Sequence, residues 1–274
     1  MTSPREGTFK DKSGNRWYRD PSNPSRTWPG VTSVLGVKKV STLEKAKLNG
    51  TAMYAAHNRV ALAGMTKAAT YALLRDQSVT LPDWDVGRDF GTATHTVLEN
   101  VIKGQPLDTD LQVVEGTATY PVDNTFTEWV PKWWDEFVKD FDVEVVECEE
   151  TVTSPLGYGG SFDLILRVNG VLTMVDAKSN RGGPRDSVAL QNEAYRRCPE
   201  IIDMTTGVRR PMPEVERSAV LWLRPEGWNL YPLKDGDPVW RRFYAHLLLF
   251  QDQDVSMMGE GLNDGPNTIQ YRRW

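Results

Sequence analysis

The dipeptide Asn169-Gly170 stands between two runs of apolar residues, and it is the feature that most constrains the fold of this chain. The runs extend from 162 to 168 and from 171 to 175. Asn-Gly in such a setting is the strongest short-range signal for a two-residue β-hairpin turn. A turn of this kind pairs Val168 with Val171 and thereby fixes the register of both strands.

That register brings three ionisable residues together. Asp163 falls opposite Asp176, and Lys178, two residues further along, points to the same face. Opposed carboxylates on a hairpin have Cβ atoms roughly 5 Å apart and repel each other. The neighbouring residues are apolar on both faces, as in a buried strand, where an unpaired charge is costly. A divalent cation between the carboxylates would remove that cost; the alternative is a solvated hairpin end with a surface Asp–Lys pair.

Helical and extended patterns alternate along the chain, which predicts an α/β fold. At the start of the chain we expect a hairpin within 8–18 and a loop over 20–29. Helices are expected over 41–63 (with a weak point at Gly50), 66–75, 85–103 and 186–197, and two more begin at Thr125 and near Asp237. Strands are expected over 143–153, 218–223 and 228–233. In the helix that opens at Thr125, aromatic residues recur at helical spacing, which favours core packing over base stacking.

Length and composition narrow the class of protein. A chain of 274 residues can bury one sizeable core with helical additions, and 39% hydrophobic and 25% charged residues are typical of globular proteins. We find no long apolar stretch and no signal-peptide core, so we expect a cytoplasmic protein without membrane contact. The net charge of −5 does not indicate nucleic-acid binding, so any such contact needs a local basic channel. Cys148 and Cys198 are too few for a four-cysteine cluster.

His95 lies on the predicted 85–103 helix, beside its apolar stripe. Glu99 follows one turn later, where it can accept a hydrogen bond from the imidazole and orient it. Gln191 and Tyr195 share a face of the predicted 186–197 helix in the same way. Spacing alone leaves these residues open to structural interpretations: a packed histidine, and a surface helix with one half-buried tyrosine.

Four short motifs in order carry a resemblance to a known family. They are Gly91-x-x-x-His95, Gly160-x-x-Asp163, Asp176-x-Lys178 and Gln191-x-x-x-Tyr195. Together, over roughly 87–197, they resemble the PD-(D/E)XK nuclease superfamily, in particular its RecB-like exonuclease branch of the phage-encoded type. The segment 28–35 is similar to the start of many phage members. The small number of cysteines separates the chain from relatives with an iron–sulfur cluster.

The resemblance implies a restriction-endonuclease-like core, with a central mixed β-sheet flanked by helices and an N-terminal helical extension. We expect residues 1–84 to form a hairpin and helical extension packed on the core, 85–258 to form the core, and 259–274 to form a C-terminal tail.

The resemblance also implies the roles of the site residues. Asp163, Asp176, the main-chain carbonyl of Ala177 and His95 would hold Mg²⁺ or Mn²⁺, with imidazole suiting manganese at least as well as magnesium. Asp163 and Asp176 would act in catalysis together with Lys178, which either stabilises charge or serves as a base.

Further residues are expected to contact DNA or to support the site. The resemblance assigns this role to Gln191 and Tyr195. Glu149 matches a glutamate on the strand before the hairpin, although two other glutamates crowd it. Candidate basic positions are Arg181 and Arg185, followed by the adjacent arginines 196 and 197.

The function implied is metal-dependent hydrolysis of DNA phosphodiester bonds by an exonuclease that acts on DNA ends or single strands, in the host cytoplasm if the protein is phage-encoded. A structure-specific or sequence-specific endonuclease on the same core is an alternative. A catalytically inactive DNA-binding or assembly module is another, although every motif acid and base is present.

Overall fold

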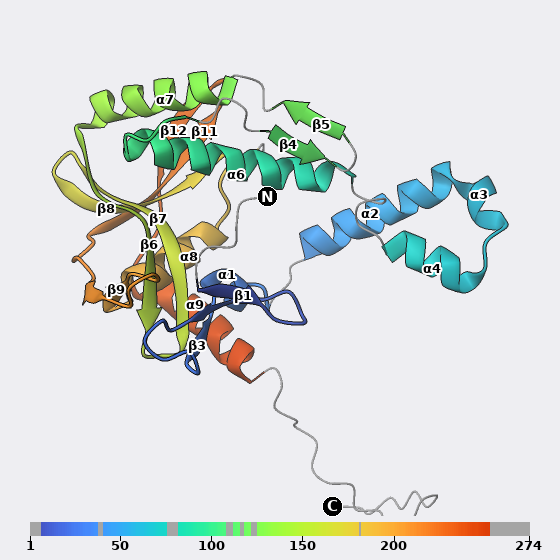
Figure 1. Cartoon of the computed structure of the whole chain (residues 1–274), viewed down its shortest axis with the longest axis horizontal. Helices are drawn as coiled ribbons and strands as arrows, with labels where there is room; N and C mark the ends of the chain where they lie inside the picture. Colours follow the sequence, from blue (N-terminus) through green and yellow to red (C-terminus); the bar gives the residue numbers. More distant parts are fainter. Residues whose placement is uncertain are drawn as a thin grey trace, which may run out of the picture.

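The computed structural model describes residues 7–37, 41–75, 82–107, 112–115, 118–121, 125–180 and 182–252. A mixed seven-stranded sheet runs through its centre, with helices on both faces (Figure 1). This is the architecture expected of a restriction-endonuclease-like core. The strands are β6 (Val143–Ser154), β7 (Tyr158–Val168), β8 (Val171–Lys178), β9 (Glu200–Ile202), β10 (Arg209–Pro211), β11 (Arg217–Arg224) and β12 (Gly227–Pro232).

The sheet has the strand order β10-β9-β6-β7-β8-β11-β12. Strands β8 and β11 run parallel, and the other neighbouring pairs are antiparallel. A parallel pair needs a crossover, and the chain supplies it through α8 (Ser187–Arg196), which leaves the carboxyl end of β8. The crossover therefore brings α8 close to the end of the predicted Asp-x-Lys strand.

The β7–β8 hairpin has the register that the Asn-Gly turn predicts. Its pairs run from Val168 with Val171 to Leu164 with Val175. Asn169 and Gly170 have φ angles of 48° and 81°, the left-handed conformation that such a turn requires. The ladder stops one pair short of Asp163 and Asp176, so the strands begin to separate where the ionisable residues stand.

Two hydrophobic clusters hold the layers together. Helices α6 (Pro82–Ile102) and α7 (Thr125–Phe141) cover one face of the sheet, and α1 (Val31–Leu35), α8 and α9 (Asp237–Gln251) cover the other (Figure 1). The aromatic row of α7 lies in the first cluster, which confirms core packing; its buried members are Phe126, Trp129, Trp134 and Phe137. Full burial of such side chains contributes about 1.5–3 kcal/mol each.

The N-terminal region forms a three-stranded antiparallel sheet of β1 (Thr8–Lys10), β2 (Arg16–Arg19) and β3 (Thr27–Pro29). The predicted hairpin is confirmed, but the prediction of a loop over 20–29 is wrong for its last residues, which form β3. There Trp28 pairs with Tyr18 and is buried, and that burial favours an extended strand over a loop. Gly30, the residue directly after β3, forms an isolated bridge to Gly159 of β7, which docks this small sheet on the core.

Three helices follow: α2 (Ser41–His57), α3 (Arg59–Ala63) and α4 (Lys67–Arg75). They extend away from the central sheet in Figure 1. The predicted weak point at Gly50 is wrong, since the helix breaks at Asn58. The Asn58 side chain donates a hydrogen bond of 3.0 Å to the carbonyl of Tyr54, and asparagine favours helix ends for this reason.

Sequence reasoning missed the short elements. Strands β9 and β10 and the hairpin of β4 (Gln112–Glu115) and β5 (Ala118–Pro121) have only three or four residues each, too few to show a periodic pattern. The predicted division into extension, core and tail stays a prediction, and residues 259–274 lie outside the described part of the chain. None of the described helices is long and apolar enough to cross a bilayer.

Candidate metal centre and active site

Three carboxylates stand on three adjacent strands of the central sheet. Glu149 of β6 lies opposite Asp163 of β7, because Cys148 pairs with Leu164 and Glu150 with Phe162. Asp176 of β8 occupies the next register position beyond the last β7–β8 pair. The order β6-β7-β8 within the sheet thus brings one acidic residue from each strand to the same level.

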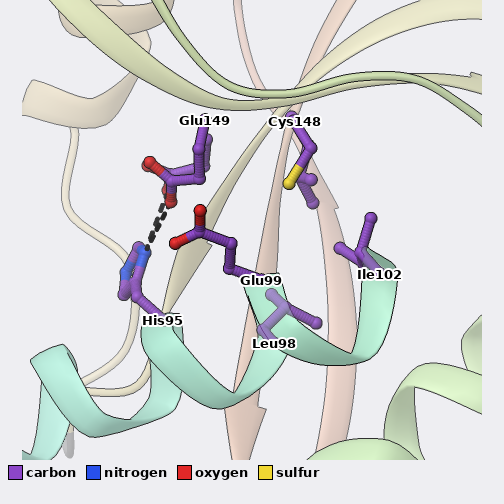
Figure 2. Close-up of a pocket in the computed structure, with 8 residues that line it drawn as sticks. His95, Leu98, Glu99, Ile102, Cys148 and Glu149 are labelled. Atoms are coloured by element: carbon purple, nitrogen blue, oxygen red, sulfur yellow. Dashed lines mark ion pairs between the residues drawn. The ribbon is translucent and has the colours of Figure 1, made fainter. Parts of the chain in front are cut away.

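His95 of α6 completes a group of possible metal ligands with Glu149 and Asp163. Its Nδ1 atom lies 3.8 Å from Oε1 of Glu149 (Figure 2). The same atom lies 3.6 Å from Oδ2 of Asp163. One ligand atom from each of the three residues lies within 4.8 Å of the others. These spacings exceed hydrogen-bond distances but suit ligands that share one cation about 2.1 Å from each.

The pocket beside these ligands is small. It has about 10 Å³ of free space, roughly enough for one water molecule or ion. Leu98 and Ile102 of α6 and Cys148 of β6 supply its less polar wall (Figure 2). Burial raises the pKa of the Cys148 thiol to about 11, so this residue lines the pocket as a neutral group. One nitrogen and two carboxylate donors therefore form the set that fits Mn²⁺ or Mg²⁺ here.

The backbone of β6 directs Glu149 toward the group of possible metal ligands, whereas the neighbouring glutamates have other partners. Glu149 has a φ of 61°, and the register of β6 shifts between Val145 and Glu147. Glu147 and Glu150 both pair with Arg210 of β10, whose Nη2 atom lies 2.7 Å from Glu147 and 3.3 Å from Glu150. A left-handed residue other than glycine costs roughly 1–3 kcal/mol, and such residues cluster at functional sites. No sequence signal indicates this conformation.

Asp176 is buried and lies outside the three-ligand group. Its Oδ1 atom accepts a hydrogen bond of 3.1 Å from Gln191 of α8, and its Oδ2 atom forms an ion pair with Lys178. Lys178 also donates to the carbonyl of Ala177 over 3.2 Å. The Ala177 amide in turn donates to Asp163 over 2.8 Å. The Lys178 ammonium thus contacts two of the predicted metal ligands, Asp176 and Ala177.

Burial and the neighbouring charges have opposing effects on the pKa values of Asp176 and Lys178. Burial raises the pKa of Asp176 to about 7; the Lys178 charge works against this shift and the Asp163 charge adds to it. Burial lowers the pKa of Lys178, but the charges of Asp176 and Asp163 outweigh it, so the net shift is upward. Lys178 is therefore positively charged at neutral pH, as a group that stabilises negative charge must be.

Tyr195 is buried in the core cluster beneath β7 and packs on Gly160. A Cβ atom at Gly160 would lie 2.3 Å from the Tyr195 ring, so only glycine leaves room for the tyrosine. This contact links two of the predicted motifs, Gly-x-x-Asp and Gln-x-x-x-Tyr, through packing. It supports a structural contribution of Tyr195 at the base of the site.

We predict that Gly160→Ala and Gly91→Ala change stability in opposite directions. Gly160→Ala should lower the free energy of unfolding by about 1–3 kcal/mol, because the added methyl overlaps the buried Tyr195 ring. Gly91→Ala places its methyl 3.9 Å from Ser179 Oγ, an ordinary contact, and alanine stabilises a helix by up to about 1 kcal/mol. Urea unfolding of both variants measures the difference; equal stabilities would contradict this packing argument.

The remaining predicted residues have varied surroundings. Glu99 lines the same pocket and forms an ion pair of 2.6 Å with Lys103, and its predicted orienting role stays a prediction. Arg185 is exposed in the loop after β8, and Arg181 lies outside the described residues. Arg196, the last residue of α8, and Arg197, which follows it, form ion pairs with Glu193 and with acidic residues just before and at the start of α9.

Two residues that sequence reasoning missed fix the chain directly after Lys178. Arg224 of β11 donates a hydrogen bond of 2.7 Å to the carbonyl of Ser179, and Trp222 donates one of 2.9 Å to the carbonyl of Asn180. The Arg224 guanidinium also lies 4.9 Å from the centre of the Phe90 ring in α6. Arg224 thus connects the strand of Lys178 with the helix of His95, a link that only the parallel β8–β11 pairing creates.

Comparison with known proteins finds no matching family model and no matching curated protein. Among solved structures, the chain is similar to an alkaline exonuclease from Laribacter hongkongensis, with 9% sequence identity and a TM-score of 0.33. The match covers 59% of this chain and 77% of the exonuclease chain. A likeness this distant assigns no function, so function must be argued from the site residues themselves.

Proposed function

We propose that this protein is a metal-dependent DNA nuclease of the PD-(D/E)XK superfamily, and within it a RecB-like exonuclease. The observation that supports this most is the joint presence of His95, Glu149 and Asp163 within ligand distance of one another and a charged Lys178 on the next strand. Four motifs that are dispersed over the sequence meet at this one position of the fold.

The residues divide into a metal-holding set and a charge-stabilising set. His95, Glu149 and Asp163 would hold the cation. A bound divalent cation supplies Lewis-acid polarisation of a phosphate and acidifies a coordinated water. Lys178 carries a positive charge that can stabilise the negative charge that develops on the phosphate during hydrolysis. Gln191 fixes the Asp176 carboxylate by its hydrogen bond, and Asp176 in turn positions the Lys178 ammonium.

The cleavage experiment compares linear and closed-circular DNA in Mn²⁺, in Mg²⁺ and in EDTA, with Lys178→Ala as a matched inactive variant. Metal-dependent loss of linear DNA alone supports the exonuclease. Cutting of the circle indicates an endonuclease on the same core. Absence of cleavage under every condition contradicts the enzyme proposal and leaves the DNA-binding or assembly module.

We predict that Arg224→Met lowers kcat by about tenfold to a hundredfold with little change in KM. The substitution removes the donor to Ser179, and small displacements of a catalytic group cost that much. Arg217→Met, an exposed position at the other end of β11, is the control. Arg224→Lys, which retains charge but not the planar donor pair, should recover only part of the activity. Steady-state kinetics measures kcat and KM of each variant. A rise in KM alone would mean that Arg224 contacts the substrate and does not position Lys178.

A further inference from the structure

Helices α2, α3 and α4, here called the helical arm, differ in charge from the rest of the chain. Between Ser41 and Arg75 the sequence has five lysines and arginines and one acidic residue, Glu44. The whole chain, in contrast, has a net charge of −5. Five basic residues and one acidic residue give this segment a net charge of +4, the sign that a polyanion requires, within a chain that is acidic as a whole.

The described side chains of the helical arm form no core of their own. None of the described side chains between Leu48 and Arg75 is buried, and the arm extends away from the central sheet (Figure 1). Large apolar side chains stay exposed along it: Leu48 at 69%, Met53 at 61%, Val60 at 83% and Tyr71 at 62%. Helices of five and nine residues, such as α3 and α4, gain little stability without packing, so this surface is suited to a partner that covers it.

We propose that the helical arm is a DNA-binding surface. It would hold the substrate beyond the N-terminal end of α6, away from the metal centre. The inference rests on the proposed nuclease function and deepens it. Charge complementarity favours DNA over a protein partner, because the arm is basic and carries a single carboxylate. The guanidinium of Arg75 lies 5.3 Å from the centre of the Tyr71 ring, which places a cation beside an exposed aromatic face of the kind on which bases stack.

The length of α6 sets the reach between the metal centre and the arm. Thirteen residues separate His95 from Pro82, where α6 begins, and a helix rises 1.5 Å per residue, so this span is about 20 Å. Helix α4 of the arm ends at Arg75 and precedes α6 in the chain. At about 3.4 Å per nucleotide, a strand bound at the metal centre needs roughly six nucleotides before it reaches Pro82, the end of α6 that follows the arm in the sequence. The arm should therefore affect long substrates and leave very short ones unchanged.

The experiment measures DNA affinity in EDTA, where no cleavage occurs, by fluorescence anisotropy with oligonucleotides from 6 to 40 nucleotides long. The test variant is Arg59→Gln/Lys67→Gln/Arg75→Gln, which neutralises three exposed cations of the arm. The control variant is Lys234→Gln/Arg241→Gln/Arg242→Gln, which removes the same charge from exposed positions in and just before α9. Circular dichroism establishes that both variants are folded.

We expect the test variant to bind long oligonucleotides about tenfold to a hundredfold more weakly than the parent and the control, with equal affinity for the shortest ones. The slope of log affinity against log salt should fall by about 2–3, because each lost phosphate contact contributes roughly 0.7–0.9. Equal affinity of test and control variants at every length would overturn the proposal while leaving the nuclease function intact. Arm-dependent binding without any cleavage would overturn the nuclease function instead.

Self-association is the competing explanation of the exposed apolar residues. Sedimentation of the parent and of Val60→Glu, which alters the most exposed large apolar side chain in the described part of the chain, distinguishes the two cases. A parent that is monomeric at the concentrations of the binding experiment supports the DNA surface. A parent dimer that Val60→Glu dissociates would identify a second copy as the partner and overturn the proposal.

Discussion

Asp176→Asn is expected to abolish cleavage, by a factor of the order of 10³, while the folded protein keeps its stability or gains some. The loss follows because the asparagine cannot position the Lys178 ammonium through an ion pair. Cleavage of linear DNA in Mn²⁺ measures it. Asp203→Asn, at an exposed turn, is the matched control and should leave the rate unchanged.

The stability of Asp176→Asn should depend on pH in a defined direction. Burial raises the pKa of Asp176 to about 7, above its ordinary value of 3.8, so the folded protein holds this proton more tightly than the unfolded chain. The parent therefore loses stability as the pH rises through about 7, and the asparagine variant does not. The melting temperature of Asp176→Asn minus that of the parent should therefore increase from pH 5.5 to pH 8.5, measured in EDTA.

Two results would contradict this interpretation of Asp176. Near-normal turnover of the variant would mean that the carboxylate is not part of the active site. A melting-temperature difference that is flat over this pH range would mean that the carboxylate is ionised at no cost. The Asp203→Asn control should give a flat difference, because hydrogen bonds from Thr206 lower the pKa of Asp203 and keep it ionised over this range.

Glu149→Gln is expected to weaken Mn²⁺ binding by at least about tenfold to a hundredfold. Loss of groups that only orient metal ligands already costs that much, and in the proposed centre Glu149 would supply a ligand atom itself. Glu150→Gln makes the same change of charge one residue away, where the carboxylate pairs with Arg210 instead. Isothermal titration calorimetry compares the two variants with the parent.

The Glu149/Glu150 comparison separates ligation from general electrostatics. A long-range effect of charge would weaken binding in both variants to a similar degree, and that outcome would remove Glu149 from the metal centre. Loss in Glu149→Gln alone would support a centre of His95, Glu149 and Asp163. Cleavage should fall in parallel with metal binding and recover in part at higher Mn²⁺ concentration.

Local chemistry explains what could be predicted from the sequence. A two-residue Asn-Gly turn permits one register, so the strands of the β7–β8 hairpin and the proximity of Asp163, Asp176 and Lys178 follow from the chain alone. The aromatic row of α7 likewise lies in the core because its spacing leaves one apolar face. Strands of three residues, such as β9 and β10, show no such pattern, and sequence reasoning missed them.

The sequence by itself determined which residue types meet near the hairpin, since turn geometry and helical spacing act over a few residues. The tertiary structure decided their partners. It selected Glu149 over its neighbours through a left-handed backbone in β6, placed His95 above it by packing α6 on the sheet, and tied Arg224 to the end of β8. These contacts join residues that are far apart in the chain, and they depend on the packing of the whole core, which no local pattern encodes.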